Sequence, residues 1–148
     1  MEIGAAEYRL AAPEMLEGAI LADGAGKYIA SHYLSGLAVE CTLRAYRWRI
    51  DTSWDGRHVL LRLAKAARFY EVVPDTARET FQTHFGEIAR RWANDHRYSS
   101  ASKLEKYLNS IGATVNVKGN KLKENSRVMT EGAHFIVSIG ESQWNRRT

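Results

Sequence analysis

The sequence predicts an all-α fold, and three observations support that prediction. Apolar residues recur at the three- and four-residue spacing of helices in about five to six segments, while the alternation typical of strands is nearly absent. Only 2 prolines occur in the chain. The composition, 45% hydrophobic and 26% charged over 148 residues, is that of a globular domain able to bury a core. We therefore expect one domain over residues 1–148, a bundle of about five to six helices with its core at about 13–144.

The first two helices are expected on either side of a break rich in glycine. The first follows Pro13 and ends at Gly24 and Gly26, because glycines favour a break. The second, IASHYLSGLAVECTLRAYRWR, has the clearest helical periodicity. Its predicted apolar stripe is Leu34, Leu37, Cys41, Ala45 and Trp48.

The third and fourth helices follow a polar turn, DTSWDG. The third lies in RHVLLRLAKAARFY, with Leu60, Leu63, Ala64 and Ala67 as its buried side. Pro74 and Asp75 open the fourth, and Thr76 with Glu79 has the spacing of a capping box. Its predicted stripe is Ala77, Phe81, Phe85, Ile88 and Trp92.

Two further helices are expected in the last third of the chain. One begins near Ser102, whose spacing to Glu105 repeats the capping signal, and its apolar side is Leu104, Leu108 and Ile111. The segment ATVNV resembles a short strand but has no second strand with which to pair. The last helix begins at Lys121, and its predicted inner positions are Leu122, Ser126, Met129, Ala133, Ile136 and Gly140.

Several functional classes are disfavoured by the sequence. The N-terminal residues lack a basic stretch followed by an apolar one, so we expect no secretion signal and a cytoplasmic location. No apolar run is long enough to cross a bilayer. The five histidines are scattered and none pairs with another at metal-binding spacing, so we expect no metal and no cofactor. The net charge of +4 is a mild bias toward anionic partners.

Chemistry-bearing side chains concentrate in RRWANDHRYSS, from Arg90 to Ser100. Cleaving RNA without a metal requires a proton acceptor for the ribose 2′-hydroxyl, a proton donor for the leaving 5′-oxygen and a cation near the phosphorus. Histidine can transfer protons near neutral pH, and the guanidinium fork of arginine matches phosphate oxygens. Arg91 and His96 supply these two types across a helix end, and Asn94 and Asp95 could orient them.

The same segment also has a purely structural interpretation. Arginines at a helix C-terminus oppose the helix dipole, asparagine and aspartate suit the turn that follows, and serines cap the next helix. An arginine and a histidine five positions apart are common in helical proteins, so this spacing alone does not assign a function.

The chain resembles the HEPN superfamily of small α-helical domains. The resemblance rests on YIASHYLSGLAVECTLRA, GRHVLLRLAKAARF and RWANDHRYSS, and it extends over about residues 13–144 through KENSRVMTEGAHFIVSIGESQW. Family members with an intact R-x4-6-H motif are metal-independent ribonucleases of bacterial defence and toxin–antitoxin systems. They act as homodimers in which the two motifs meet in a cleft.

The resemblance implies specific roles for residues of this segment. Arg91 matches the motif arginine and would stabilise the transition state, and His96 matches the motif histidine and would be the general base or acid. Toxins that pair with a minimal nucleotidyltransferase antitoxin carry R-x4-H-x-Y, which Arg91, His96 and Tyr98 satisfy. Tyr98 would then accept AMP from the antitoxin, and the added anion would switch the toxin off.

One departure leaves a non-catalytic alternative open. Active members usually have a small or polar residue after the motif arginine, whereas this chain has Trp92. The chain could instead be a non-catalytic HEPN module that binds RNA, a nucleotide or a nucleotidyltransferase partner, with Arg97 as the more important arginine, or a structural interaction domain. Glu40 interrupts an apolar run, and it is expected either to hold a motif arginine or to pair with Arg44.

Overall fold

The computed structural model describes residues 3–52 and 58–146. Over these residues the chain has seven α-helices, two 3-10 turns and no strand, so the all-α prediction is confirmed. The α-helices are α1 Ala5–Gly24, α2 Tyr28–Ile50, α3 Leu60–Ala66, α4 Phe69–Val72, α5 Arg78–Arg91, α6 Ala101–Ser110 and α7 Lys121–Gln143. The 3-10 turns are η1 Asp75–Ala77 and η2 Asn94–Tyr98.

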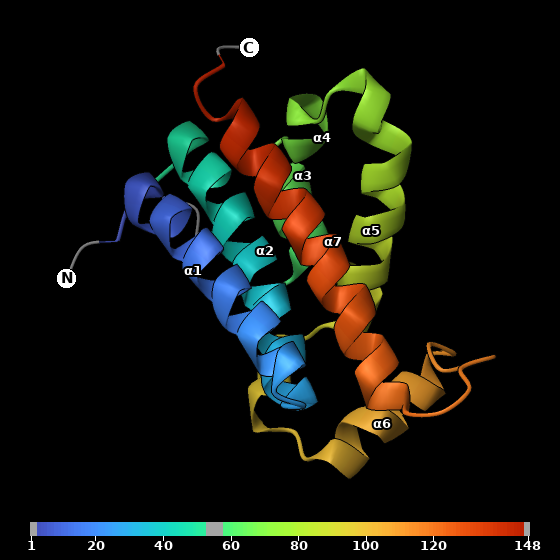
Figure 1. The fold of residues 1–148 in the computed structure, drawn as a ribbon. Coiled ribbons are helices and arrows are strands. Elements are labelled where there is room, and N and C mark those ends of the chain that lie inside the picture. The colour runs from blue at the N-terminus through green and yellow to red at the C-terminus, as the bar shows by residue number, and fades with distance from the viewer. Residues whose placement is uncertain (1–2, 53–57, 147–148) are drawn as a thin grey trace.

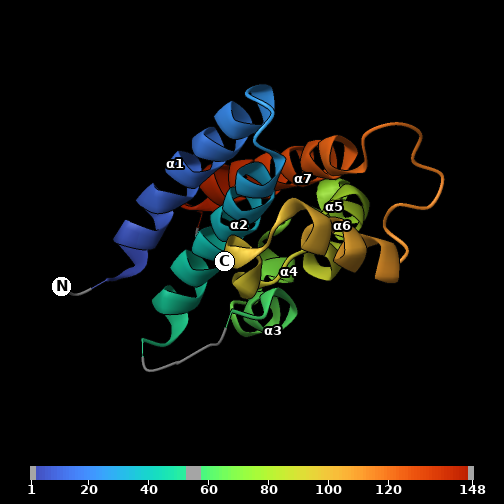
Figure 2. The same ribbon diagram turned by 90° about the horizontal axis from the view of Figure 1, so that it is seen from below.

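The long helices form a bundle with α2 at its centre. Figure 1 shows α1, α2 and α7 side by side, with α5 packed against α7. α2 and α7 run in one direction, and α1 and α5 run in the other. Figure 2, seen from below, shows η2 and α6 at the end of the bundle where α1 and α5 finish and α2 and α7 begin. Three separate parts of the chain, the α1–α2 turn, the α5–η2–α6 segment and the start of α7, therefore meet at this lower end.

The first helix differs from its predicted start, and the second differs from its predicted buried side. α1 begins at Ala5 rather than at Pro13, and Pro13 lies inside it with its ring exposed. A proline removes one helical hydrogen bond, so the contact of α1 with α2 must outweigh that loss. α2 is buried on more than the single predicted side, because α1, α3 and α7 all pack against it.

The third predicted helix is divided in two. Arg68 adopts a left-handed conformation with φ 52°, which ends α3 and starts α4 and so gives one helix more than expected. The predicted inner residues Leu60, Leu63, Ala64 and Ala67 are all buried. The predicted turn DTSWDG falls mostly on residues 53–57, outside the described residues.

Neither predicted capping signal is the one that the structure uses. η1 precedes α5, and no side chain caps that helix, so the box predicted at Thr76 is not formed. α6 is capped by Ser100, whose hydroxyl accepts the backbone N–H of Lys103, rather than by Ser102. The segment ATVNV forms turns instead of a strand.

The main core lies between α2, α5 and α7 and includes the α3–α4 segment. Phe69, Phe81 and Phe85 are fully buried, and the rings of Phe81 and Phe85 stack with centroids 5.4 Å apart. Each such ring contributes about 1.5–3 kcal/mol through burial. A second, smaller cluster around Leu104 and Leu108 fixes α6 at the lower end. Within the described part of the chain, no helix has the length and apolar character required to span a membrane.

Candidate functional site

The junction between α5 and η2 is held against α2 by Trp92. This residue ends α5 in an extended conformation, and its indole lies directly over Gly36. A Cβ atom added to Gly36 would lie 2.1 Å from Cδ1 of Trp92, so only glycine allows this approach. The indole Nε1 donates to the carbonyl oxygen of Tyr33 at 3.1 Å, and the Tyr33 ring stacks on the indole. Trp92 therefore fixes the α5–η2 junction, and with it Arg91 and His96, against α2.

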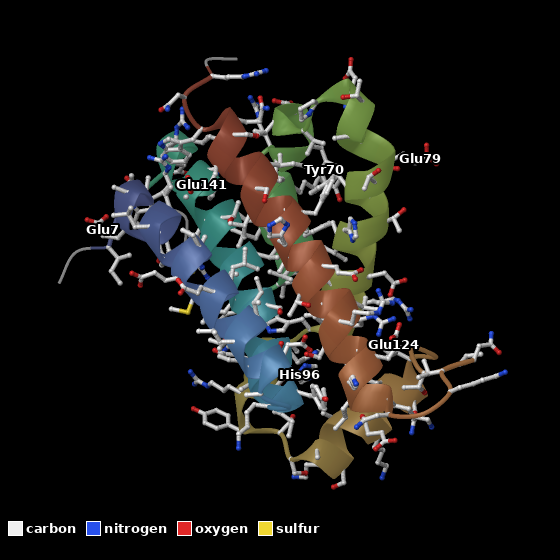
Figure 3. All side chains as sticks on the ribbon, in the orientation of Figure 1. Glu7, Tyr70, Glu79, His96, Glu124 and Glu141 are labelled. Carbon is white, nitrogen blue, oxygen red and sulfur yellow. The ribbon has the colours of Figure 1, made fainter. Side chains whose placement is uncertain are left out.

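η2 turns the imidazole of His96 back into the bundle. The backbone N–H of His96 donates to the Ala93 carbonyl at 3.0 Å, and the backbone N–H of Ala93 donates to Nδ1 of His96 at 3.2 Å. The His96 side chain is 7% exposed. Figure 3 shows it at the lower end of the bundle, close to the start of α2 and α7.

A chain of hydrogen bonds joins Arg91 to His96 through two other helices. Nη1 of Arg91 donates to Oδ1 of Asn125 on α7 at 3.1 Å, and Nδ2 of Asn125 lies 2.9 Å from Nδ1 of His32 on α2. Nε2 of His32 lies 2.9 Å from Nδ1 of His96. Behind Arg91, Oε2 of Glu87 accepts its Nε at 2.8 Å. All four residues from Arg91 to His96 along this network are buried.

The arginine sets the direction of every bond in the network. Because guanidinium only donates, Asn125 must turn its oxygen to Arg91 and its NH2 to His32. Nδ1 of His32 is then an acceptor, and its proton lies on Nε2, which donates to His96. Nδ1 of His96 thus accepts two N–H groups, from His32 and from Ala93. A neutral His96 consequently carries its proton on Nε2.

The electrostatics agree with two neutral histidines. Burial, followed by the charges of His96 and Arg91, lowers the pKa of His32 from 6.5 to about 3. Burial also lowers the pKa of His96, and the nearby Asp95 carboxylate opposes this only in part. Burial alone would raise the pKa of Glu87, but hydrogen bonds and charges from Arg91 and Arg90 lower it overall. At neutral pH the network therefore contains one ion pair and two uncharged imidazoles.

The remaining predicted residues of the motif lie around this network. Asn94 accepts a 3.5 Å hydrogen bond from the Tyr33 hydroxyl, and Asp95 is exposed, so neither of them orients the imidazole of His96 by direct contact. Arg97 is exposed, and its guanidinium lies over the ring of Tyr98, 4.5 Å from the centroid. The Tyr98 side chain is 76% exposed.

Glu40 has partners other than the motif arginine. It is buried on α2, where its Oε1 lies 3.6 Å from Nη2 of Arg44 and 2.5 Å from Nδ1 of His58. The carboxylate that holds Arg91 is that of Glu87, one helical turn earlier on α5. Of the two expectations for Glu40, the structure shows the pair with Arg44.

Sequence reasoning missed three members of the network: Glu87, His32 and Asn125. The Glu87–Arg91 spacing of four residues was a readable signal for an ion pair on one helix face. His32 and Asn125 are 93 positions apart, and nothing local to either residue indicates that they meet. Among the described residues, no group of three or more histidine, cysteine or acidic side chains could hold a metal ion.

Comparison with known proteins gives no family: no family model matches the chain, and no curated protein or solved structure matches it significantly.

Proposed function

We propose that this protein is a metal-independent endoribonuclease of the HEPN type, in which His96 handles the proton. The observation that supports this proposal is the pair of N–H groups directed at Nδ1 of His96. They fix Nε2 as the proton-bearing nitrogen, and they stabilise negative charge on the ring when that proton is shared or lost. A neutral imidazole with a lowered pKa can serve as an electrophilic donor in this way.

The reaction follows the chemistry of RNA itself. The ribose 2′-oxygen attacks the adjacent phosphorus, the new O2′–P bond forms and the P–O5′ bond breaks. The 2′-hydroxyl proton passes to water, and Nε2 of His96 gives its proton to the departing 5′-oxygen and regains one from solvent. The products are a 2′,3′-cyclic phosphate and a 5′-hydroxyl, and no metal enters the reaction.

Arg91 acts in this proposal mainly through its neighbours. Two of its three nitrogens, Nε and Nη1, are used by Glu87 and Asn125, and its side chain is 7% exposed. It is therefore a positioning residue, which sets the orientation of Asn125 and, through His32, the tautomer of His96. Only its Nη2 edge is left to approach a phosphate.

The proposal includes a homodimer and a modification site. Two copies of the chain would bring two His96 side chains to one RNA cleft, as the family resemblance implies. The exposed hydroxyl of Tyr98, two residues from His96, would accept AMP from a minimal nucleotidyltransferase antitoxin. A nucleotidyltransferase gene next to the gene for this chain, and a mass increase of one AMP on Tyr98 after co-expression, would support this part.

The decisive experiment is cleavage of single-stranded RNA in the presence of a chelator. We expect the wild-type protein to produce 2′,3′-cyclic phosphate ends and His96→Ala to produce none. His134→Ala, which removes an exposed histidine on α7, is the matched control and should cleave normally. Circular dichroism must show that both variants are folded. If the purified wild-type dimer leaves RNA uncut, the proposal is wrong.

One observation favours a second candidate, a non-catalytic module that binds RNA or a nucleotide. Arg91 and His96 are both almost fully buried, whereas Arg97 and Tyr98 are exposed at the same junction. In this alternative the buried network only holds the junction in place, and the exposed pair makes the contacts. RNA binding without cleavage, weakened by Arg97→Ala but not by His96→Ala, would identify this function.

A further inference from the structure

A pocket of about 670 Å³ opens beside the His96 junction. Its walls come from the loop after α1, the first turns of α2, η2, and the starts of α6 and α7. Two tyrosines, Tyr28 and Tyr33, line it together with aliphatic side chains that include Leu34 and Leu122. Its volume falls within the range of about 300–1,000 Å³ that is usual for pockets that bind small molecules.

The two charged side chains of this pocket are both cationic. Lys27 and Arg97 line it, and neither has a carboxylate within ion-pair distance among the residues that the structure describes. Elsewhere on the surface, arginines such as Arg90 and Arg127 are paired with glutamates. Unpaired cations beside apolar and aromatic walls complement a ligand that combines a flat ring with a phosphate.

The pocket is connected to the candidate site by direct contacts. Tyr33 lines the pocket, stacks on Trp92 and donates its hydroxyl to Asn94, two residues before His96. Arg97 is the residue directly after His96. A phosphate bound by Arg97 would therefore be held next to the segment that carries the imidazole. His32 precedes Tyr33 on α2 and contacts His96 from the inside.

We propose that this pocket binds one unstacked base of a single-stranded RNA, with Lys27 and Arg97 on the flanking phosphates. Proteins that bind single strands use this combination of aromatic platforms and a positively charged path for the backbone. A duplex keeps its bases stacked and cannot place one in the pocket. The proposal rests on the proposed ribonuclease function for the identity of the polymer, and it names the part of the substrate that the site recognises.

The test measures binding without cleavage. A short single strand of 2′-O-methyl RNA cannot be cut, because its 2′-oxygen is blocked, and its affinity for the wild-type protein is measured by fluorescence anisotropy. The same backbone with abasic sugars reports the phosphate contacts alone. We expect Tyr28→Leu to weaken binding of the base-bearing strand about tenfold, a value within the range for one base–aromatic stack, and to leave the abasic strand unaffected.

The cations are tested through the salt dependence. Lys27→Ala and Arg97→Ala should each reduce the slope of log affinity against log salt by about 0.7, the value for one phosphate contact on a single strand. Tyr70→Leu and Lys106→Ala are matched controls outside this pocket and should bind as the wild type does. Tyr70 lies at the opposite end of the molecule from His96 in Figure 3.

The outcomes separate this inference from the ribonuclease proposal. The pocket proposal is wrong if Tyr28→Leu binds the base-bearing strand as tightly as Tyr70→Leu does. It is also wrong if the wild type does not bind single strands. Either result counts against the pocket even where unmodified RNA is cleaved. If the pocket variants behave as expected but unmodified RNA stays intact in chelator, the pocket proposal holds and the ribonuclease proposal fails.

Discussion

The low pKa of His32 makes this protein sensitive to mild acid. The imidazole is fully buried, with a pKa of about 3 in the folded chain against an ordinary value of 6.5. The unfolded chain therefore binds a proton below pH 6.5 that the folded chain does not bind, so stability rises with pH in this range. The contribution is complete above pH 6.5 and is lost as the pH falls toward 3.

The size of the effect follows from the linkage relation. Near pH 5, protonation of the unfolded state lowers the free energy of unfolding by about 2 kcal/mol through His32 alone. The lowered pKa of His96 acts in the same direction. The lowered pKa of Glu87 adds its own loss only below its ordinary value of 4.5, so a comparison between about pH 7.5 and pH 5 isolates the histidines.

Urea unfolding followed by circular dichroism at these two pH values measures the effect. We expect His32→Gln to reduce the acid-induced loss of unfolding free energy by about 2 kcal/mol relative to the wild type, whatever its stability at neutral pH. His134→Gln removes an exposed histidine and should retain the full loss. An equal loss in His32→Gln and the wild type would refute the low pKa of His32 and, with it, the direction of the hydrogen-bond network.

Two further predictions concern the junction and the helix beyond it. Gly36→Ala would force a Cβ atom against the indole of Trp92 and should destabilise the fold by about 1–3 kcal/mol. Gly86 lies in open space on α5, so Gly86→Ala should stabilise the fold by about 0.5–1 kcal/mol. Thermal unfolding of both variants measures these changes. Ser100→Ala removes the hydroxyl that caps α6 and should lower the unfolding free energy by about 1 kcal/mol in urea titrations. Ser102→Ala should change it by less than half as much, because Ser102 does not cap the helix.

Helical periodicity was sufficient for most of the fold, because helices such as α5 and α7 bury mainly one side in the core. In α7 the predicted positions Met129, Ala133 and Ile136 are all fully buried. The apolar pattern predicted the buried residues of α2 less well. This helix packs on several sides, and the polar residues buried there interrupt any apolar stripe. The break at Arg68 was not readable, because arginine is not a residue type, such as glycine, that signals a left-handed conformation.

The candidate site was predictable only where its residues are neighbours in the sequence. Arg91 and His96 could be paired from their spacing, and the structure connects them, although through intermediates. His32 and Asn125 enter from α2 and α7, and only the tertiary arrangement brings their side chains to Arg91 and His96. Trp92 was read as a departure from an active motif, but its packing on Gly36 became visible only once α2 and α5 were placed together.

The same network that keeps both histidines neutral also decides how the rate of the proposed reaction should depend on pH. A protonated His96 would be a stronger acid toward the 5′-oxygen, but a proton at its Nδ1 would oppose the N–H groups of His32 and Ala93. Protonation of His96 would therefore break these two hydrogen bonds at the same step that made its Nε2 a stronger proton donor. Because burial lowers the pKa of His96 and keeps it neutral in the folded protein, we expect the cleavage rate of folded protein not to rise as the pH decreases from 7 toward 5. A rate that rises over this interval in folded protein would mean that His96 works as an imidazolium, and that the two N–H groups on Nδ1 do not set its role.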